Sequence, residues 1–109
     1  MEKTKRVYIS GQMSGLKKFE YTLHFKKAAK YLRSNGYEPI DPSKVCCGEN
    51  ISYADVLLLD MKTIMDCGVI FMLDNWENSK GATAEYYFAK AIGLEIMFET
   101  DVDYHTNLY

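Results

Sequence analysis

Apolar residues along this chain occur in two arrangements, short continuous runs and helical intervals, and the two arrangements alternate. The clearest run covers residues 68–73, G-V-I-F-M-L, which is apolar as expected for a parallel strand covered on both faces. Shorter runs predict strands at residues 6–10, 37–40 and 94–98, although Pro39 weakens the second. Four strands are therefore expected, separated by segments of helical periodicity.

The three segments between these strands have the spacing and the ends of amphipathic helices. Residues 18–34 end at Ser34-Asn35-Gly36, a typical C-terminal stop. The second helix begins with Ser52 and Asp55 as a capping box, and the third begins after Ser79 as N-cap. The predicted inward stripes are Phe25, Ala28, Ala29 and Leu32 in the first helix, Leu57, Asp60, Met61 and Ile64 in the second, and Glu85, Phe88, Ala89 and Ile92 in the third.

Strands that alternate with helices predict a right-handed parallel α/β fold. We expect residues 1–109 to form a single domain, a three-layer sandwich with a parallel sheet of four to five strands, flavodoxin-like or Rossmann-like. A chain of 109 residues and 12.6 kDa is long enough for one core. In such sheets ligands bind beyond the carboxyl ends of the strands, where the loops at residues 11–15, 41–50 and 74–81 are expected to meet.

Two of these loops contain residues suited to an anion or a sugar. The first loop has two glycines, Gly11 and Gly15, that let backbone amides approach a ligand. The side chains of Gln12 and Met13 lie between them in the sequence and are candidate binding residues. Ser79 and Gly81 add the unpaired N–H groups and the positive dipole end of a helix N-terminus. Ser79 alone is most simply a plain N-cap. Together the two loops predict an anion pocket.

Two carboxylates lie on apolar helix stripes, where a charge is costly. Glu85 is about one and a half turns into its helix, too far from the N-terminus for a capping box. Asp60 repeats this placement in the preceding helix, with a structural alternative in which it caps a loop or pairs with a lysine. Two inward acids near one sheet edge suit nucleophile and acid roles. Tyr8 and Trp76 could be core residues or stacking walls of the pocket.

Composition and charge exclude several classes of function. Hydrophobic residues make up 48% and charged residues 26% of the chain, and thirteen basic against fifteen acidic residues give a net charge of -2. This balance lacks the basic field that wraps nucleic acid, so no nucleic-acid partner is expected. The apolar runs are far shorter than the roughly 20 residues of a membrane span, and the N-terminus lacks a signal peptide. A cytoplasmic protein without a membrane partner is expected.

The cysteines and histidines predict no further chemistry. Cys46, Cys47 and Cys67 form an odd set without a C-x-x-C pair, which argues against a disulfide framework and a zinc site. His24 and His105 are isolated in the sequence, so neither a metal site nor a catalytic triad is expected. We expect no metal and no cofactor.

The chain resembles the nucleoside 2-deoxyribosyltransferase-like superfamily in three motifs. These are Y-I-S-G-x-M-x-G, D-x-x-x-I and, after an apolar strand, W-x-x-S-x-G-A-x-x-E. The resemblance extends from Val7 to about Met97 and is to its small branch from bacteria and phages, related to nucleotide 5′-monophosphate N-glycosidases. It implies that Glu85 acts as nucleophile at C1′ of a sugar. It also implies that Asp60 works near the leaving base and that Tyr8 lies in the same pocket.

One position in this pattern bears on the substrate. Where transferases acting on free nucleosides have an acidic residue facing the 5′-hydroxyl, this chain has Ser79, as do the nucleotide N-hydrolases. A carboxylate would repel a phosphate, whereas a serine hydroxyl at a helix N-terminus would bind it. The resemblance therefore implies a nucleoside 5′-monophosphate as substrate.

Two further classes of function compete with an N-glycosidase or deoxyribosyltransferase. One is a non-catalytic protein that binds or sequesters a nucleotide, and the other is an inert relative of the same fold. The pair of carboxylates favours the enzyme, because a protein that only binds an anion gains nothing from them. Release of free base from a nucleoside or nucleotide would distinguish the enzyme from the other two classes.

The helix at residues 52–65 also predicts an assembly. It carries apolar residues outside its inward stripe, namely Val56, Leu58, Leu59 and Met65. A helix that is apolar on most sides is buried on most sides. We therefore expect a homodimer or higher homo-oligomer packed through this helix, with the tail around Tyr104 and Tyr109 reaching towards the neighbour's pocket.

Overall fold

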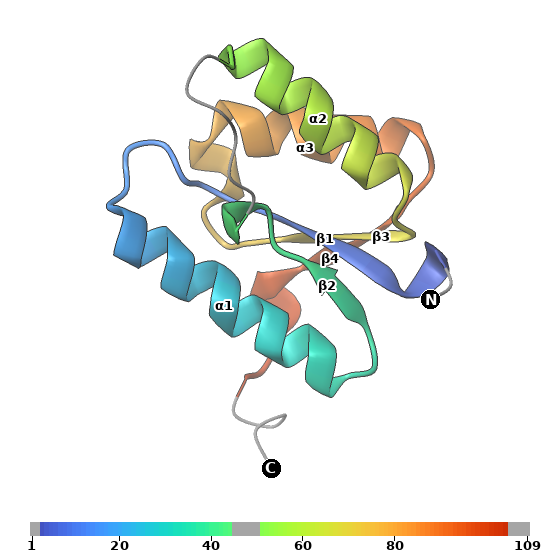
Figure 1. Cartoon of the computed structure of the whole chain (residues 1–109). Helices are drawn as coiled ribbons and strands as arrows, with labels where there is room; N and C mark the ends of the chain where they lie inside the picture. The colour runs from blue at the N-terminus through green and yellow to red at the C-terminus, as the bar shows by residue number, and fades with distance from the viewer. Residues whose placement is uncertain (1–2, 45–50, 105–109) are drawn as a thin grey trace.

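A parallel sheet of four strands forms the middle layer of the molecule (Figure 1). The computed structural model describes residues 3–44 and 51–104. The strands are β1 (Arg6–Ser10), β2 (Glu38–Ile40), β3 (Val69–Met72) and β4 (Glu95–Phe98), in the order β2-β1-β3-β4. On the inner strand β1, Tyr8 pairs with Ile40 of β2 on one side and with Ile70 of β3 on the other, and every neighbouring pair is parallel. The predicted parallel α/β fold is confirmed.

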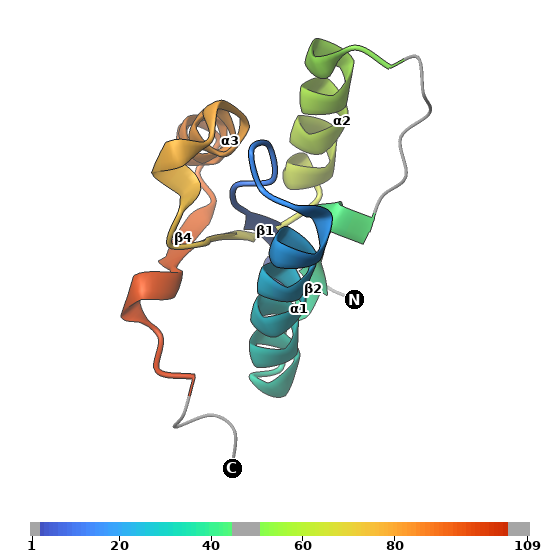
Figure 2. The ribbon, with the colours of Figure 1, turned by 90° about the vertical axis from the view of Figure 1, so that its left-hand side faces the viewer.

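Three α-helices of the described residues cover the sheet, one on the first face and two on the second (Figures 1 and 2). Helix α1 (Lys18–Ser34) lies alone, whereas α2 (Tyr53–Met65) and α3 (Lys80–Ala91) lie side by side on the opposite face. Ser52 and Ser79 are the N-caps of α2 and α3, and their hydroxyls accept backbone N–H groups of Asp55 and Ala82. The predicted three-layer sandwich and its helix starts are therefore confirmed.

Each face of the sheet has its own hydrophobic core. On the α1 face, the predicted helix stripe packs against alternate residues of the inner strands: Phe25, Ala28, Ala29 and Leu32 against Val7, Ile9, Val69 and Phe71. On the other face, Ile64 and Ala89 pack against Tyr8, Ile70 and Met72. Because side chains alternate along a strand, Tyr8 and Ser10 share the face that α2 and α3 cover. This alternation positions the site described below.

Several element ends differ from the sequence prediction. Strands β2, β3 and β4 begin at Glu38, Val69 and Glu95, each one residue later than expected, and β3 ends at Met72, one residue earlier. Ile92 was expected on the buried stripe of α3, and this expectation is wrong, because the helix ends at Ala91 and the Ile92 side chain is 45% exposed. Gly93 then turns the chain with a φ of 87°, in the left-handed region that favours glycine.

The C-terminal segment also differs from the expectation. Tyr104 was expected near a neighbouring subunit, but it packs on its own chain, with its ring 5.4 Å from that of Tyr31 and its hydroxyl bonded to Glu99. The predictions for Cys46, Cys47, His105 and Tyr109 lie outside the described residues. Within residues 3–44 and 51–104, no helix is long and apolar enough to cross a membrane.

Candidate functional site

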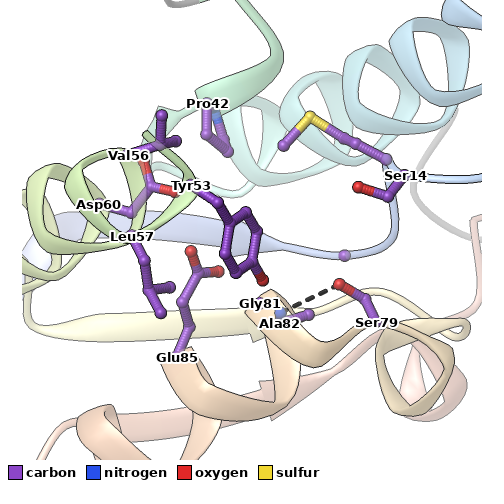
Figure 3. A pocket seen from close by; sticks show the side chains of 12 residues that line it. Ser14, Pro42, Tyr53, Val56, Leu57, Asp60, Ser79, Gly81, Ala82 and Glu85 are labelled. Carbon is purple, nitrogen blue, oxygen red and sulfur yellow. Dashed lines mark hydrogen bonds between the residues drawn. The ribbon is translucent and has the colours of Figure 1, made fainter. Parts of the chain in front are cut away.

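A pocket of about 190 Å³ opens at the carboxyl edge of the sheet, between α2, the start of α3 and the loop after β1 (Figure 3). The loop supplies Gly11, Met13 and Ser14, α2 supplies Tyr53, Val56, Leu57 and Asp60, and the α3 region supplies Ser79, Gly81, Ala82 and Glu85. Pro42, which follows β2, completes the wall. The pocket lies where parallel α/β sheets bind ligands.

Glu85 is the buried acid of this pocket, with 6% of its surface exposed. Ser10 Oγ donates a hydrogen bond to Glu85 Oε1 at 2.7 Å, and Tyr8 Oη donates to Glu85 Oε2 at 3.1 Å. Both donors are on β1, two residues apart, so they point to the same face. Each carboxylate oxygen is therefore held by one hydroxyl of the sheet, which fixes the orientation of the Glu85 carboxyl in the pocket.

Asp60 faces the same pocket from α2, and Figure 3 shows its carboxyl and that of Glu85 directed into one space. Burial raises the pKa of Glu85 to about 8, against the lowering effect of the Ser10 hydrogen bond, and the charge of Asp60 raises it further. Burial also raises the pKa of Asp60, and side-chain hydrogen bonding with Glu85 and Tyr8 partly offsets this rise. Two such groups retain a proton between them near neutral pH. The pair can present one carboxylate and one carboxylic acid to a ligand.

Tyr8 is a core residue whose hydroxyl reaches the site. Its side chain is 1% exposed and packs in the core under α2 and α3. Burial raises the pKa of Tyr8 well above its usual value, and the charges of Glu85 and Asp60 add to this effect. The phenol therefore stays protonated and supports Glu85 as a hydrogen-bond donor from beneath.

The N-terminus of α3 forms the opposite wall. Ser79 Oγ accepts the N–H of Ala82 at 3.1 Å, which is the predicted N-cap bond (Figure 3). The N–H groups of Lys80 and Gly81 belong to the first turn, so they have no acceptor within the helix. These groups and the helix dipole suit an anionic part of a ligand.

Some residues of the loop after β1 line the pocket, and others pack against the rest of the fold. Gly11 and Met13 line the pocket, but a Cβ on Gly11 would lie 2.8 Å from Leu73 Cβ, so packing against the end of β3 already requires this glycine. The backbone N–H of Gln12 donates to Asn75 Oδ1 at 3.0 Å. Gly15 has a φ of 87° and forms the turn. Gln12 and Gly15, expected to bind a ligand, are placed outside the pocket lining.

Trp76 also lies away from the pocket. Its ring packs 4.6 Å from that of Tyr86 and 6.5 Å from that of Phe98, beside the core under α3. The sequence left open whether Trp76 is a core residue or a pocket wall, and the structure places it against the core and not in the pocket lining. The short 3-10 helix Trp76–Asn78 turns the indole towards the core before Ser79 caps α3.

Among the site residues that were not predicted from the sequence, Ser10 and Tyr53 matter most for the chemistry of the pocket. Ser10 is fully buried and holds Glu85, and the available signal was its spacing of two from Tyr8 in β1. Tyr53 lines the pocket from the first turn of α2 although its side chain is 61% exposed. It precedes Asp60 by seven residues, two helical turns, so the shared helix face was the signal.

A second buried carboxylate, Glu99, lies at the end of β4 and is 7% exposed. Its Oε1 is 2.8 Å from His24 Nε2 and accepts the backbone N–H of Asp74 at 2.8 Å, while its Oε2 accepts the Tyr104 hydroxyl. Burial alone would raise the pKa of Glu99, but these donors outweigh it and hold the pKa below its usual value. The hydrogen bond to Glu99 raises the pKa of His24, against the effect of burial. His24, which the sequence predicts to be a surface or half-buried residue, is half-buried, and its partner Glu99 is distant in the sequence.

This second cluster is also the place to consider a metal. Among the described residues, His24, Asp74 and Glu99 offer ligand atoms within 4.8 Å of one another. The oxygens of Glu99 already accept hydrogen bonds from the imidazole, a backbone amide and a phenol. We therefore interpret the cluster as an ion pair that anchors the segment after β4 to α1.

The pocket unites an acid pair with an anion-binding helix end, an arrangement that can stabilise positive charge in a ligand while gripping its anionic group. No curated protein matches the chain. The chain belongs to the family described as Domain of unknown function (DUF4406), whose model matches residues 5–98 and so includes every residue of the pocket.

Proposed function

We propose that the protein cleaves or transfers the N-glycosidic bond of a nucleoside 5′-monophosphate or nucleoside, with Glu85 as the nucleophile. The observation that carries this proposal is the buried Glu85 carboxyl, held by Ser10 and Tyr8 beside the acid Asp60. Glycosidic cleavage passes through a transition state with positive charge on the sugar and needs a proton for the leaving base. The resemblance to the nucleoside 2-deoxyribosyltransferase-like superfamily supports the same roles.

In the free protein the proton shared by the pair lies on Glu85. In the proposed reaction this proton passes to Asp60 when substrate binds, because the positive charge that develops on the sugar favours an ionised Glu85. The ionised Glu85 then attacks C1′ while the bond from C1′ to the base nitrogen breaks. Asp60 gives its proton to the departing base. Water or a second base then attacks C1′ and breaks the ester to Glu85, and Asp60 takes the proton that the attacking group loses. Tyr8 and Ser10 keep the Glu85 oxygens in place through both steps. Both carboxyl groups thereby return to their starting states.

We place the 5′-phosphate at the N-terminus of α3, where Ser79 and the first-turn N–H groups face the pocket. The variant Ser79→Asp adds a charge that repels phosphate and can still cap the helix. We expect its ratio of kcat/KM for the nucleotide to kcat/KM for the nucleoside to fall about tenfold or more. An unchanged ratio would mean that the phosphate binds elsewhere.

The proposal is tested by incubating the protein with a panel of nucleosides and their 5′-monophosphates and measuring free base by chromatography. Glu85→Gln, which keeps the side-chain volume, is the matched control for contaminating activity. We expect base release from at least one nucleotide by the wild type and none above background by the variant. Nucleotide binding without base release would support the non-catalytic alternative instead.

We further propose that the protein acts in the cytoplasm as a homodimer packed through α2. Leu58, Leu59 and Met65 on this helix are 62%, 45% and 51% exposed, which leaves an apolar strip for a second copy to cover. Light scattering at micromolar concentration is expected to give twice the mass of the chain, and Leu58→Glu is expected to return the monomer. A wild-type monomer would overturn the assembly, and a dimer that survives Leu58→Glu would overturn the surface.

A further inference from the structure

A second cavity of about 220 Å³ adjoins the pocket of the acid pair, and we call it the outer part and the first pocket the inner part. Asn78 and Lys80 line this outer part, whereas Asp60 and Glu85 line the inner part. Tyr53 lines both, together with Ser14, Ser79 and Gly81. In Figure 3 the Tyr53 ring crosses the mouth from α2 and its hydroxyl points towards Gly81 at the start of α3. Tyr53 therefore stands at the boundary between an acidic inner part and an outer part with a lysine.

The position of Gly81 is explained by this tyrosine. Gly81 is the second residue of α3 and is not among the glycines with positive φ, so its backbone conformation is open to any residue. Glycine inside a helix costs about 1 kcal/mol relative to alanine. A Cβ on Gly81 would lie 3.0 Å from Tyr53 Oη, closer than ordinary contact. The glycine thus leaves room for the Tyr53 hydroxyl at the helix N-terminus.

The core does not account for the placement of Tyr53. Its side chain is 61% exposed, and Ser52 fixes the start of its helix through two hydrogen bonds with Asp55. An exposed aromatic ring over a cavity offers an apolar face to a sugar and a donor at its tip. The first-turn N–H groups beside that tip attract an anion, so the hydroxyl and the helix end can bind one group together.

We propose that Tyr53 is a specificity-determining residue that packs its ring on the sugar and donates its hydroxyl to the 5′-phosphate. This inference rests on the proposed function, because it needs a substrate whose sugar lies over Glu85 and whose phosphate lies at α3. The sugar then occupies the inner part under the Tyr53 ring. The phosphate occupies the boundary, within the field of Lys80 and the α3 N-terminus.

The test is steady-state kinetics with a 5′-monophosphate that the wild type cleaves and with the matching nucleoside. Tyr53→Phe removes only the hydroxyl, so we expect KM for the nucleotide to rise about tenfold, with kcat and the nucleoside KM within about twofold of wild type. Tyr53→Ala also removes the ring and is expected to raise KM for both substrates. Tyr87→Phe, at a tyrosine of α3 that is 60% exposed and outside the pocket, is the matched control.

A second variant tests the contact itself. Gly81→Ala places a methyl group against the Tyr53 hydroxyl, so it is expected to raise the nucleotide KM in the wild-type background and to add little in Tyr53→Ala. Equal KM changes for nucleotide and nucleoside in Tyr53→Phe, or none, would overturn the role of Tyr53 while leaving the proposed function in place. A wild type that neither cleaves nor binds nucleotides by calorimetry would overturn both.

Discussion

Glu85 and Glu99 are the same residue type, buried to the same degree, and the fold treats them in opposite ways. They are 6% and 7% exposed. Glu99 accepts hydrogen bonds from a backbone amide and a phenol and lies against an imidazole, and its pKa is held below the usual value. Glu85 accepts hydrogen bonds from two hydroxyls and faces the acid Asp60, and burial raises its pKa to about 8. The donors around Glu99 offset the cost of burying its charge, whereas the two hydroxyls around Glu85 do not offset that cost beside Asp60.

This difference separates a structural carboxylate from one that is available for chemistry. A buried charge with matched donors stabilises the native state, as Glu99 does by tying α1 to the segment after β4. A buried acid beside a second acid disfavours ionisation and destabilises the fold at neutral pH, unless a ligand brings positive charge. Glu85 opens into a pocket beside a second acid, which supports a reactive role for it, whereas the donors around Glu99 support a structural one.

The largest effect is expected in the activity of Glu85→Gln. The variant keeps the volume of the side chain and can still bond to Ser10 and Tyr8, but it has no nucleophilic charge. We expect kcat for base release to fall about a thousandfold or more, with KM nearly unchanged and the thermal midpoint equal to or above that of the wild type. A large loss of stability in this variant would instead make Glu85 a structural residue like Glu99.

The next effect is a loss of stability in Glu99→Gln. One oxygen of Glu99 becomes an amide that faces a donor, and His24 loses its counter-charge. We expect the free energy of unfolding in urea to fall by about 1–3 kcal/mol at pH 6, with base release per folded molecule close to wild type. Glu95→Gln, at an exposed position of β4, is the control and is expected to be neutral. Loss of activity without loss of stability would reverse the assignment.

The smallest effect is the pH dependence of stability, which has opposite signs at the two sites. The pKa of Glu85 in the folded state lies above its usual 4.5, so its contribution falls as pH rises from about 4.5 to about 8. Glu85→Gln should therefore gain stability relative to wild type across that range. Thermal unfolding at several pH values measures this, and parallel curves for the two proteins would contradict the raised pKa.

The same experiment on Glu99→Gln should give a different curve. The pKa of Glu99 is lowered, so its stabilisation is present above its usual 4.5 and is lost as pH falls through the lower folded value. The pKa of His24 is raised, so its contribution is complete below its usual 6.5 and is lost as pH rises through the folded value. The loss of stability of Glu99→Gln relative to wild type should therefore be largest between about pH 4.5 and 6.5.

Much of the fold follows from local sequence patterns. The ends of β1 and α1 and the N-caps Ser52 and Ser79 agree with the sequence prediction, because strand runs, helix stripes and capping residues are set by neighbours in the chain. Glu85 and Asp60 were selected because a charge on an apolar stripe is a local anomaly, and the structure directs both into one pocket.

The remaining features depend on contacts between distant residues. Ser10 meets Glu85 across 75 positions, and His24 meets Glu99 across the same separation, so no local spacing shows either pair. Trp76 and Gln12 lie in loops whose residue types suit binding, but the Trp76 ring packs on Tyr86 beside the core, and the Gln12 backbone N–H donates to Asn75 Oδ1. A Cβ on Gly11 would meet Leu73, and only the packing at the end of β3 shows this requirement for glycine.

Glu85 is expected to retain a proton near neutral pH in the free protein, whereas Glu99 is not. Carbon-13 NMR titration of the glutamate carboxyl groups in the wild type measures this difference, with Glu85→Gln and Glu99→Gln used to assign the two signals. We expect the Glu85 signal to titrate near pH 8 and the Glu99 signal below its usual 4.5. A Glu85 signal that titrates near 4.5, or lower than that of Glu99, would mean that the fold does not hold a proton on Glu85.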